Sequence, residues 1–271
     1  MIRRQSHSTP KWQLAIYIVL LAVVIASMIA LSRCDKPVTL ATSQPSKGDT
    51  LDIAIEYSPV SYYTYDDTLG GYHYDLLRLI SQVARRPMKF HPIVTLQNGI
   101  DGLDSGTYDV LVAQFPTTSV NRTRFCFTQP VLIDQQVLVQ QRPAHIHSQL
   151  DLAGDTVHVV KGSPMAERIA GLSREIGDTI HVATEDTYGP EQLVMMVAAG
   201  DIRLAVVNKG IASALAKKLD NIDTSLDISL SQFQAWTLNK NNTVLRDSLN
   251  TWLNNIDKSH IEELRQRYFG N

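Results

Sequence analysis

The chain has 271 residues, of which 44% are hydrophobic and 19% charged, and its formal net charge is −2 at pH 7. Four of the 25 basic residues and one of the 27 acidic residues precede position 36, which leaves 21 against 26 and a net charge of −5. This balance excludes the basic footprint of a nucleic-acid-binding domain. The two cysteines, Cys34 and Cys126, do not indicate a disulfide framework, and we expect Cys126 to be a small buried side chain.

The first feature along the chain is a run of uncharged residues at 12–31, long enough to cross a bilayer as one helix. Basic side chains precede it, so the positive-inside bias predicts a cytoplasmic tail at 1–11 and places the rest of the chain outside the cytoplasm, which in a bacterium would be the periplasmic side of the inner membrane. Residues 31–34 also resemble a lipobox, which makes a lipoprotein modified at Cys34 the alternative. The polar stretch 32–50 is typical of a flexible spacer.

Short apolar runs alternate with helical patterns from residue 51 onward, as expected of α/β lobes built on parallel sheets. In the helix expected at 73–86, Leu76, Leu77 and Ile80 recur at helical spacing. The other helices are expected at 96–104, 164–176, 190–199, 209–219, 243–256 and 260–268. Strands are expected at 51–57, 88–94, 108–114, 125–140, 155–160, 179–184, 202–208 and 233–239.

Several helix starts carry capping signals. Ser163 followed by Pro164 predicts a hydroxyl at the N-cap and a proline in the first turn. Glu191 stands where a carboxylate favours the N-terminus of the helix at 190–199, and Asn242 is a candidate cap for the helix at 243–256. These signals support the predicted helix starts.

Four motifs then carry a family likeness. They are GYHYDLL at 71–77, GLDSGTYDV at 102–110, FTQPV at 127–131, and DLAGDTV at 151–157 with Lys161, Gly162 and Ser163 after it. In this order and spacing they resemble the bacterial extracellular solute-binding proteins of family 3, over nearly all of residues 51–271. The chain is also similar to the N-terminal solute-binding-like domain of the membrane-bound lytic transglycosylase F family.

The resemblance implies the two-lobe periplasmic-binding-protein type 2 fold. Lobe I would comprise 51–136 and 237–271, and lobe II with the hinge strands would comprise 137–236. Two strands would cross between the lobes, near 137–142 and near 231–236. A small-molecule ligand would lie in the interlobe cleft, where strand ends and helix N-termini meet, and the lobes would close over it.

The resemblance also points to individual binding residues. Arg122, after the Thr-rich turn that begins at Thr117, is the nearest match to the arginine that grips a ligand carboxylate, although a solvated basic turn is an equal alternative. Ser163 could add a hydroxyl to the same anion. Asn208 stands where amino-acid-binding members have an aspartate that neutralises the ligand ammonium. We therefore expect a polar or anionic solute, such as a peptide or muropeptide fragment, rather than a free amino acid.

Tyrosines are concentrated in the segment after the first strand. Tyr57 and Tyr63 are the candidates for stacking on a ligand there, because this segment lines the cleft in the implied fold. The alternative is that Tyr57 and one other tyrosine pack beneath the loop while the rest are exposed. The sequence does not decide between them.

No catalytic machinery is visible in the sequence. It contains no Glu-Ser dipeptide of a transglycosylase and no nucleophile, phosphate or dinucleotide motif, and the pair His145 and His147 falls short of a zinc site. We therefore expect a non-enzymatic binding protein without cofactor or metal, with a membrane transporter or a cell-wall enzyme as its candidate partner. The other functions considered are a regulatory, non-catalytic relative of the transglycosylases in cell-wall turnover and a dehydratase of the same fold.

Overall fold

The computed structural model describes residues 12, 20, 21, 49–66, 68–113, 115 and 117–270, and the chain divides into two compact units, Met1–Pro45 and Ser46–Asn271. Most of the predicted membrane segment 12–31, Cys34 and most of the spacer 32–50 therefore lie outside the described residues. Within the described ranges, no helix is both long and apolar enough to cross a membrane. The following account concerns the second unit.

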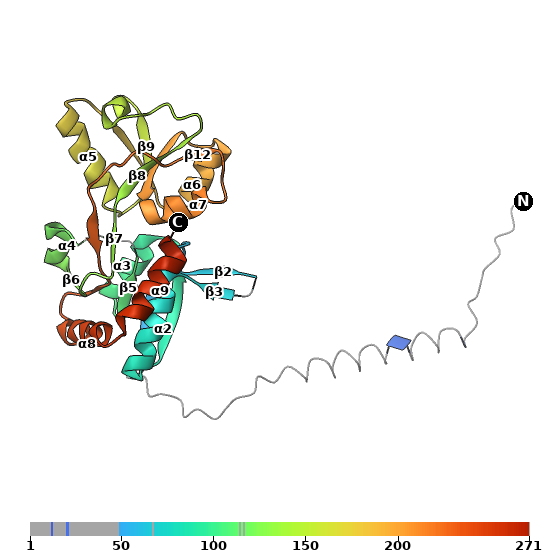
Figure 1. The fold of residues 1–271 in the computed structure, drawn as a ribbon, viewed down its shortest axis with the longest axis vertical. Helices are drawn as coiled ribbons and strands as arrows, with labels where there is room; N and C mark the ends of the chain where they lie inside the picture. The colour runs from blue at the N-terminus through green and yellow to red at the C-terminus, as the bar shows by residue number, and fades with distance from the viewer. Residues whose placement is uncertain are drawn as a thin grey trace, which may run out of the picture. The chain divides into compact units, whose positions relative to one another are not determined.

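Lobe I is built on a five-stranded sheet in the order β4-β1-β5-β14-β6 (Figure 1). Its strands are β1 (Leu51–Glu56), β4 (Met88–Ile93), β5 (Val110–Val112), β6 (Phe125–Phe127) and β14 (Thr237–Asn239). The β1 strand pairs in parallel with β4 and β5, whereas β14 runs antiparallel and returns from the far end of the chain. Cys126 on β6 is a buried free thiol, as expected.

Helices cover both faces of this sheet. They are α2 (Tyr72–Ala84), α3 (Leu96–Asp104), α4 (Ser119–Arg124), α8 (Thr243–Asn254) and α9 (Lys258–Phe269). Ile53 and Ile55 face the core shared with α2, α8 and α9, while Ala54 between them faces α3. Consecutive residues of a strand point to opposite faces of the sheet. Because both faces are buried here, the strand is a continuous apolar run in the sequence.

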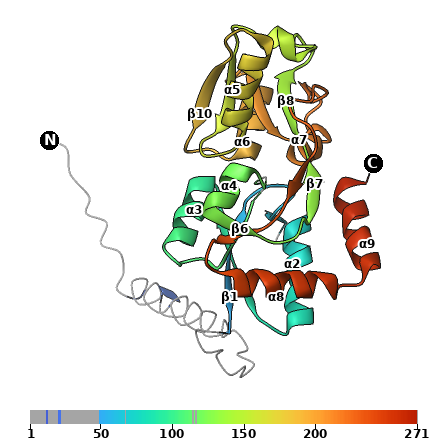
Figure 2. The same cartoon turned by 90° about the vertical axis from the view of Figure 1, so that its left-hand side faces the viewer.

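Lobe II repeats this plan with a sheet in the order β10-β9-β11-β8-β12. Its elements are β8 (Gln136–Gln141), η1 (Gln149–Leu152), β9 (Thr156–Val160), α5 (Met165–Ile176), β10 (His181–Glu185), α6 (Pro190–Ala199), β11 (Leu204–Asn208), α7 (Lys209–Ala216) and β12 (Ile222–Asp223). Residues of α5 pack on one face of the sheet and those of α6 and α7 on the other. Figure 2 shows the two lobes joined by narrow strands.

Those strands are β7 (Leu132–Asp134) and β13 (Gln232–Gln234), which pair antiparallel as a two-stranded hinge. The second crossing lies in the range predicted for it. The first was predicted at 137–142, which is wrong, because these residues are largely β8 in the lobe II sheet. The apolar pattern from 125 to 140 runs through β6, β7 and β8 with little interruption, so periodicity alone did not show which part crosses.

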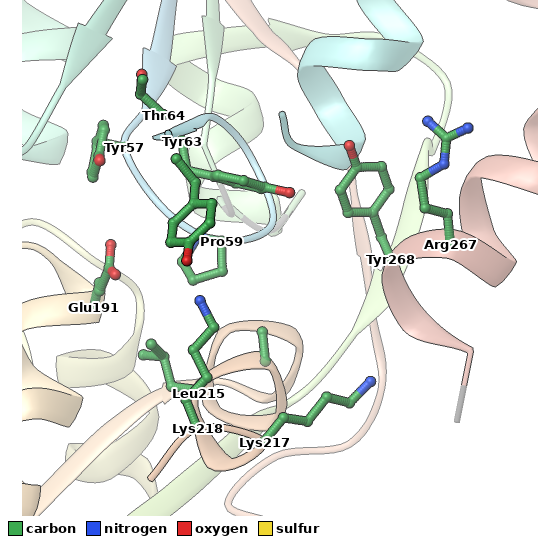
Figure 3. A pocket seen from close by; sticks show the side chains of 12 residues that line it. Tyr57, Pro59, Tyr63, Thr64, Glu191, Leu215, Lys217, Lys218, Arg267 and Tyr268 are labelled. Carbon is green, nitrogen blue, oxygen red and sulfur yellow. The ribbon is translucent and has the colours of Figure 1, made fainter. Parts of the chain in front are cut away.

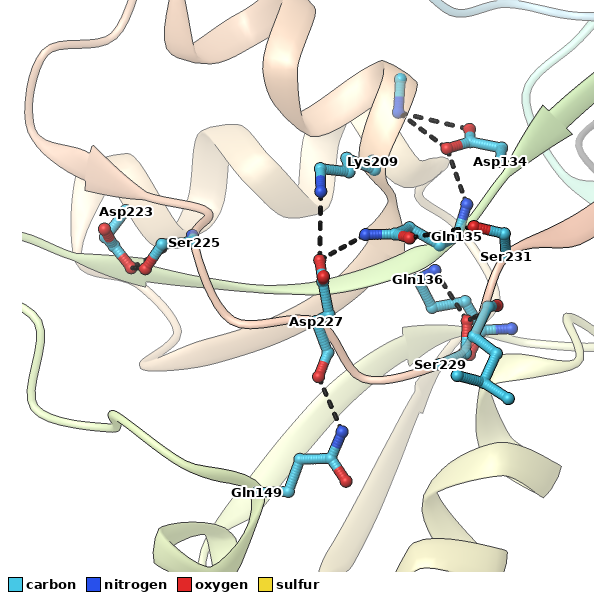
Figure 4. A network of polar contacts seen from close by, with 12 residues as sticks. Asp134, Gln135, Gln136, Gln149, Lys209, Asp223, Ser225, Asp227, Ser229 and Ser231 are labelled. Carbon is cyan, nitrogen blue, oxygen red and sulfur yellow. Dashed lines mark hydrogen bonds and ion pairs between the residues drawn. The ribbon is translucent and has the colours of Figure 1, made fainter.

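A polar network ties the two hinge strands together where they enter lobe II (Figure 4). The carboxylate of Asp227 accepts from Gln135 Nε2 at 2.5 Å and lies 3.2 Å from Lys209 Nζ. The hydroxyl of Ser229 accepts from the backbone N–H of Gln136 at 2.9 Å. These contacts join the chain leaving β7 to the chain approaching β13, so the two crossings are coupled.

Two local predictions need correction. Ser163 does not cap α5, because the N-cap position is Pro164 and the Ser163 hydroxyl instead donates to the Val160 carbonyl at 2.6 Å. The tyrosine-rich segment is not an open loop but contains a hairpin of β2 (Tyr63–Tyr65) and β3 (Thr68–Gly70). Short polar and aromatic strands of this kind carry little periodicity by which to predict them.

Candidate functional site

The lobes meet where the chain after β4 approaches the N-terminus of α6. A Cβ atom at Gly189, the N-cap of α6, would lie 2.8 Å from the carbonyl oxygen of Val94. A Cβ at Gly162 in lobe II would likewise come within 3.6 Å of Gln97 Oε1 in lobe I. The lobes are thus closed on each other along this line, and two hollows lie beside it.

The first, which we call the strand-end hollow, lies where parallel strands of both lobes end. Glu56, Val160 and Asn208 line it, and they are the last residues of β1, β9 and β11. Ser163 lines it too. The remaining wall is formed by Leu96, Met165, Pro190, Val206 and Val207, and the hollow has a volume of only about 20 Å³.

The Asn208 amide at this hollow is already engaged within the protein. Asn208 is buried, with 4% of its surface exposed, and its side chain hydrogen-bonds to Asp134 of the hinge. Asp134 also accepts from the backbone N–H groups of Gln135 at 2.8 Å and of Gly210 at 3.2 Å. Burial raises the pKa of Asp134 to about 6, and these hydrogen bonds together with nearby Lys209 oppose the rise.

The second hollow, the lateral cavity, has a volume of about 770 Å³ and is lined by residues of both lobes (Figure 3). Lobe I contributes Tyr57, Tyr63 and Tyr65 from the segment after β1 and Arg267 and Tyr268 from the end of α9. Lobe II contributes Glu191 from α6 and Leu215, Lys217 and Lys218 from the end of α7 and just beyond it. Small-molecule sites commonly measure about 300–1,000 Å³, so this cavity is the right size for a solute.

The tyrosines divide between the cavity and the core. Tyr62 packs inward, with its ring centroid 5.4 Å from that of Tyr74, whereas Tyr57, Tyr63 and Tyr65 line the cavity. The arrangement with Tyr57 packed beneath the loop is wrong for Tyr57, which lines the cavity, and stacking of Tyr57 and Tyr63 on a ligand stays a prediction. The ring of Tyr63 lies over Gly70, the residue that pairs with Tyr63 in the hairpin. A Cβ atom added at Gly70 would be 2.6 Å from Tyr63 Cζ, so the ring can lie there only because Gly70 has no side chain.

The cavity carries more positive than negative charge. Arg267 Nη1 lies 3.3 Å from Asp75 Oδ2, and Lys217 Nζ donates to the carbonyl of Gly270 at 3.3 Å. Lys218 Nζ lies 5.6 Å from the ring centroid of Tyr65, a cation–π contact. Glu191 is the one acidic residue among those that line the cavity in the described part of the chain.

Glu191 stands out among these polar groups. Its Oε2 atom is buried and has no hydrogen-bond partner in the described ranges of the chain. Burial raises the pKa of this carboxyl group, an effect that Lys218 partly offsets. An unsatisfied buried carboxylate oxygen costs free energy unless a donor reaches it.

The remaining predicted site residues lie elsewhere. Arg122 is on the exposed face of α4, with its guanidinium carbon 5.9 Å from the ring centroid of Phe127, and it lines neither hollow. Thr117 precedes α4, and its N–H donates to the Phe233 carbonyl of the hinge at 3.5 Å. The six predicted residues are thus split between the strand-end hollow (Ser163 and Asn208), the lateral cavity (Tyr57 and Tyr63) and the region of α4.

Sequence reasoning missed Glu191 as a site residue, although its place after Gly189 and Pro190 had marked it as a first-turn carboxylate. It missed Tyr268 and Arg267 for a different reason. The hydrogen bond from Tyr268 to Asp75 spans 193 residues, and no local pattern signals such a contact.

Two α/β lobes joined by a pair of crossing strands, with hollows between them, define the periplasmic-binding-protein type 2 class. Residues 50–271 match the bacterial extracellular solute-binding proteins, family 3, and the chain belongs to this family.

Solved structures with this fold agree with the assignment. An ancestral arginine-binding protein bound to glutamine superposes with a TM-score of 0.73 at 20% identity, covering 82% of this chain and 99% of that one. A structure described for glutathione import through GshT and the cystine importer TcyBC of Streptococcus mutans has a TM-score of 0.73 at 18% identity, covering 82% of this chain and 95% of that one. At this identity the likeness shows the fold.

Curated relatives point to a second context. The membrane-bound lytic murein transglycosylase F of Shewanella pealeana is 22% identical over 253 residues, which is 92% of this chain and 53% of that protein. Its namesake from Pseudomonas fluorescens is 24% identical over 254 residues, which is 92% of this chain and 51% of that protein. The chain thus spans about half the length of these relatives.

Proposed function

We propose that this protein is a solute-binding protein that captures a small polar or anionic solute between its lobes by closure. The observation that carries this is the lateral cavity, which both lobes build and which can therefore form fully only when they meet. Three cationic side chains and one carboxylate line it, a balance that favours an anionic ligand.

A free α-amino acid is a poor match to this chain. At the end of β11 the buried Asn208 amide is hydrogen-bonded to Asp134, and an amide cannot neutralise an ammonium group taken out of water. An acylated amine, as in a peptide or muropeptide fragment, avoids that cost. The neighbours named for arginine, glutamine or glutathione bind those solutes themselves, and they support solute binding here as a class.

The membrane tether belongs to the same proposal. A helix at 12–31 would hold the lobes on the periplasmic side of the inner membrane, with lipidation at Cys34 as the alternative. Alkaline extraction of bacterial membranes tests it. The full chain should remain in the membrane pellet, and a Cys34→Ala variant should remain there too if the helix is the anchor.

Isothermal titration of the purified full chain tests the solute class. We expect an acidic or N-acylated solute to bind more tightly than any standard amino acid. Tight binding of a free amino acid would contradict this choice of ligand while leaving solute binding itself intact. Failure of every small solute to bind or to raise the melting temperature would contradict the function.

The relatives support a second candidate function, regulation of cell-wall turnover without catalysis. The part of the transglycosylases that matches this chain is about half of each protein, in keeping with a binding module that acts beside a separate enzyme. Muropeptide release from cells with and without this protein tests the idea. Equal release in both strains would count against it.

A further inference from the structure

We propose that the solute is held in the lateral cavity rather than at the strand ends, and that it is a saccharide bearing a carboxylate. This inference rests on the proposed function and adds the place and the chemical class. It follows from the space in the two hollows and from the groups that face the larger one.

The strand-end hollow has no room in the closed arrangement. Its volume of about 20 Å³ is room for about one water molecule and for no larger solute. The lobes already touch at Gly189 and Val94, so the strand-end hollow is shut beside this contact. The lateral cavity, at about 770 Å³, therefore offers the room for a solute that the strand ends lack.

The walls of the lateral cavity favour a ligand with a ring face. The phenol rings of Tyr57, Tyr63 and Tyr65 come from one segment, and Leu215 faces them from lobe II (Figure 3). Aromatic rings offer a large contact area at low entropic cost, because few torsions must be restrained. The flat apolar face of a pyranose ring matches such a wall.

One end of the cavity favours a carboxylate on that ligand. The Lys218 ammonium points toward the tyrosine segment, and it forms no ion pair with a described residue. Arg267 and Lys217 are already engaged with Asp75 and the Gly270 carbonyl. Lys218 is thus the cation that remains available for a ligand anion.

Glu191 adds a requirement for donors. Its buried Oε2 has no partner among the residues that the structure describes, so a bound solute gains most if it brings a hydroxyl or N–H group to this atom. A saccharide supplies hydroxyl donors to Glu191 and also accepts from phenol groups. The tyrosine rings and the charged groups that line the cavity suit a ring face and its hydroxyl groups, and so we favour the saccharide over a peptide.

The direct test is calorimetric titration of the full chain with three probes. They are a disaccharide of hexuronic acid, the neutral disaccharide of the same linkage, and a dipeptide. We expect the acidic disaccharide to bind at least about tenfold more tightly than the neutral one, because only it can pair with Lys218. Tighter binding of the dipeptide, or no binding of the acidic disaccharide, would overturn the chemical class.

Variants of the cavity wall locate the site. Tyr63→Ala should weaken binding of the acidic disaccharide by about tenfold or more, and Tyr63→Phe should lose less because it keeps the ring. Gly70→Ala should also weaken binding, because the new methyl group displaces the Tyr63 ring although no cavity side chain is itself replaced. Its control is Gly171→Ala on α5, where an added Cβ meets nothing closer than 3.9 Å.

Lys218→Met tests the charge. In this variant the acidic and the neutral disaccharide should bind about equally well. The control is Lys89→Met at an exposed position, which should keep the preference for the acidic disaccharide. An unchanged preference in Lys218→Met would remove Lys218 from the site. Melting temperatures of all variants, compared with the unsubstituted chain, establish that a loss of binding is not a loss of folding.

A last variant separates this inference from the proposed function. Ser163→Trp fills the strand-end hollow with an indole. The inference predicts that Tyr63→Ala weakens binding more than Ser163→Trp does. The reverse order, with any solute, would overturn the lateral site while upholding solute binding, and only the absence of all solute binding would defeat both.

Discussion

Gly189 of lobe II faces the carbonyl oxygen of Val94 in lobe I, with no room for a side chain between them. An added Cβ would lie 2.8 Å from that oxygen, a distance at which one of the two backbones must move. The absence of a side chain at this position is therefore what allows the lobes to close at the start of α6. The solute-binding proposal depends on this closure.

We predict that Gly189→Val holds the lobes apart. Small-angle X-ray scattering should show a larger radius of gyration than for the unsubstituted chain, and solute affinity should fall by about tenfold, or about 1.4 kcal/mol. Gly171→Ala, whose added methyl group meets nothing closer than 3.9 Å, is the matched control. Unchanged scattering together with unchanged affinity would show that this contact does not limit closure.

The second prediction concerns His73, which is fully buried beneath the hinge. The indole N–H of Trp236 donates to its Nδ1 at 3.2 Å, and burial lowers the pKa of His73 to about 3. Between pH 6.5 and 3 the unfolded chain binds a proton here and the folded chain does not. The titration of His73 therefore leaves the free energy of unfolding unchanged above pH 6.5. Below that pH it lowers the free energy of unfolding as the pH falls, by up to about 1.4 kcal/mol per pH unit.

His73→Asn retains an acceptor for the indole but cannot titrate. Denaturant unfolding at several pH values should show a shallower loss of stability toward low pH than in the unsubstituted protein. His260→Asn at an exposed position controls for the removal of an imidazole. An identical slope in His73→Asn and in the unsubstituted protein would show that His73 does not supply the acid sensitivity.

Asp134 makes the opposite contribution. Its pKa of about 6 in the folded state exceeds its ordinary value of 3.8, so the folded chain binds more protons than the unfolded chain between these pH values. The titration of Asp134 therefore raises the free energy of unfolding as the pH falls toward 3.8, and this stabilisation is lost as the pH rises through 6. In this window the effects of His73 and Asp134 oppose each other.

Asp134→Asn should expose the effect of His73. The variant should lose stability on acidification from pH 6 to pH 4 more steeply than the unsubstituted protein, by up to about 1.4 kcal/mol per pH unit. Unfolding curves over this range provide the measurement, with the exposed Asp220→Asn as the control. Parallel pH profiles for Asp134→Asn and the unsubstituted protein would contradict the assignment.

The fourth prediction concerns the attachment of α9 to lobe I. Tyr268 Oη donates to Asp75 Oδ2 at 2.7 Å and accepts from the backbone N–H of Gly71 at 3.0 Å. Burial and the Asp75 carboxylate raise the pKa of Tyr268 to about 12, against the hydrogen bond from Gly71. Tyr268→Phe leaves the Gly71 N–H without its acceptor and leaves Asp75 Oδ2 with Arg267 alone, and it should lower the free energy of unfolding by about 1–3 kcal/mol.

Chemical denaturation measures this loss, and Tyr188→Phe at an exposed tyrosine is the matched control. A change of less than about 0.5 kcal/mol in Tyr268→Phe would mean that water replaces both hydrogen bonds without cost. It would also show that α9 is held mainly by apolar packing, for example through Leu264.

Local signals were sufficient for most helices. The helices at 96–104 and 190–199 have the predicted bounds, since α6 begins at Pro190 after Gly189 and ends before Gly200 in the left-handed conformation. The capping prediction for Ser163 is wrong because its hydroxyl bonds Val160 instead. A side chain that can bond two nearby backbone groups leaves that choice to the final geometry.

The position of the hinge was beyond local signals. Residues of β7 and β8 belong to one apolar pattern, and β13 identifies β7 as the crossing strand only by pairing with it across about 100 residues of chain. The tyrosine hairpin was missed for a related reason, because its register depends on Tyr63 pairing with Gly70.

The sequence by itself determined the α/β class, the family and most helices, because these depend on periodicity, caps and motif order, which are local properties of the chain. Only the tertiary structure decided which residues share a site. It divided the six predicted residues among three places and brought Glu191, Lys218 and Arg267 to the tyrosines. The physical reason is that closure of two lobes sets distances between segments far apart in the chain, and no pattern within either segment encodes those distances.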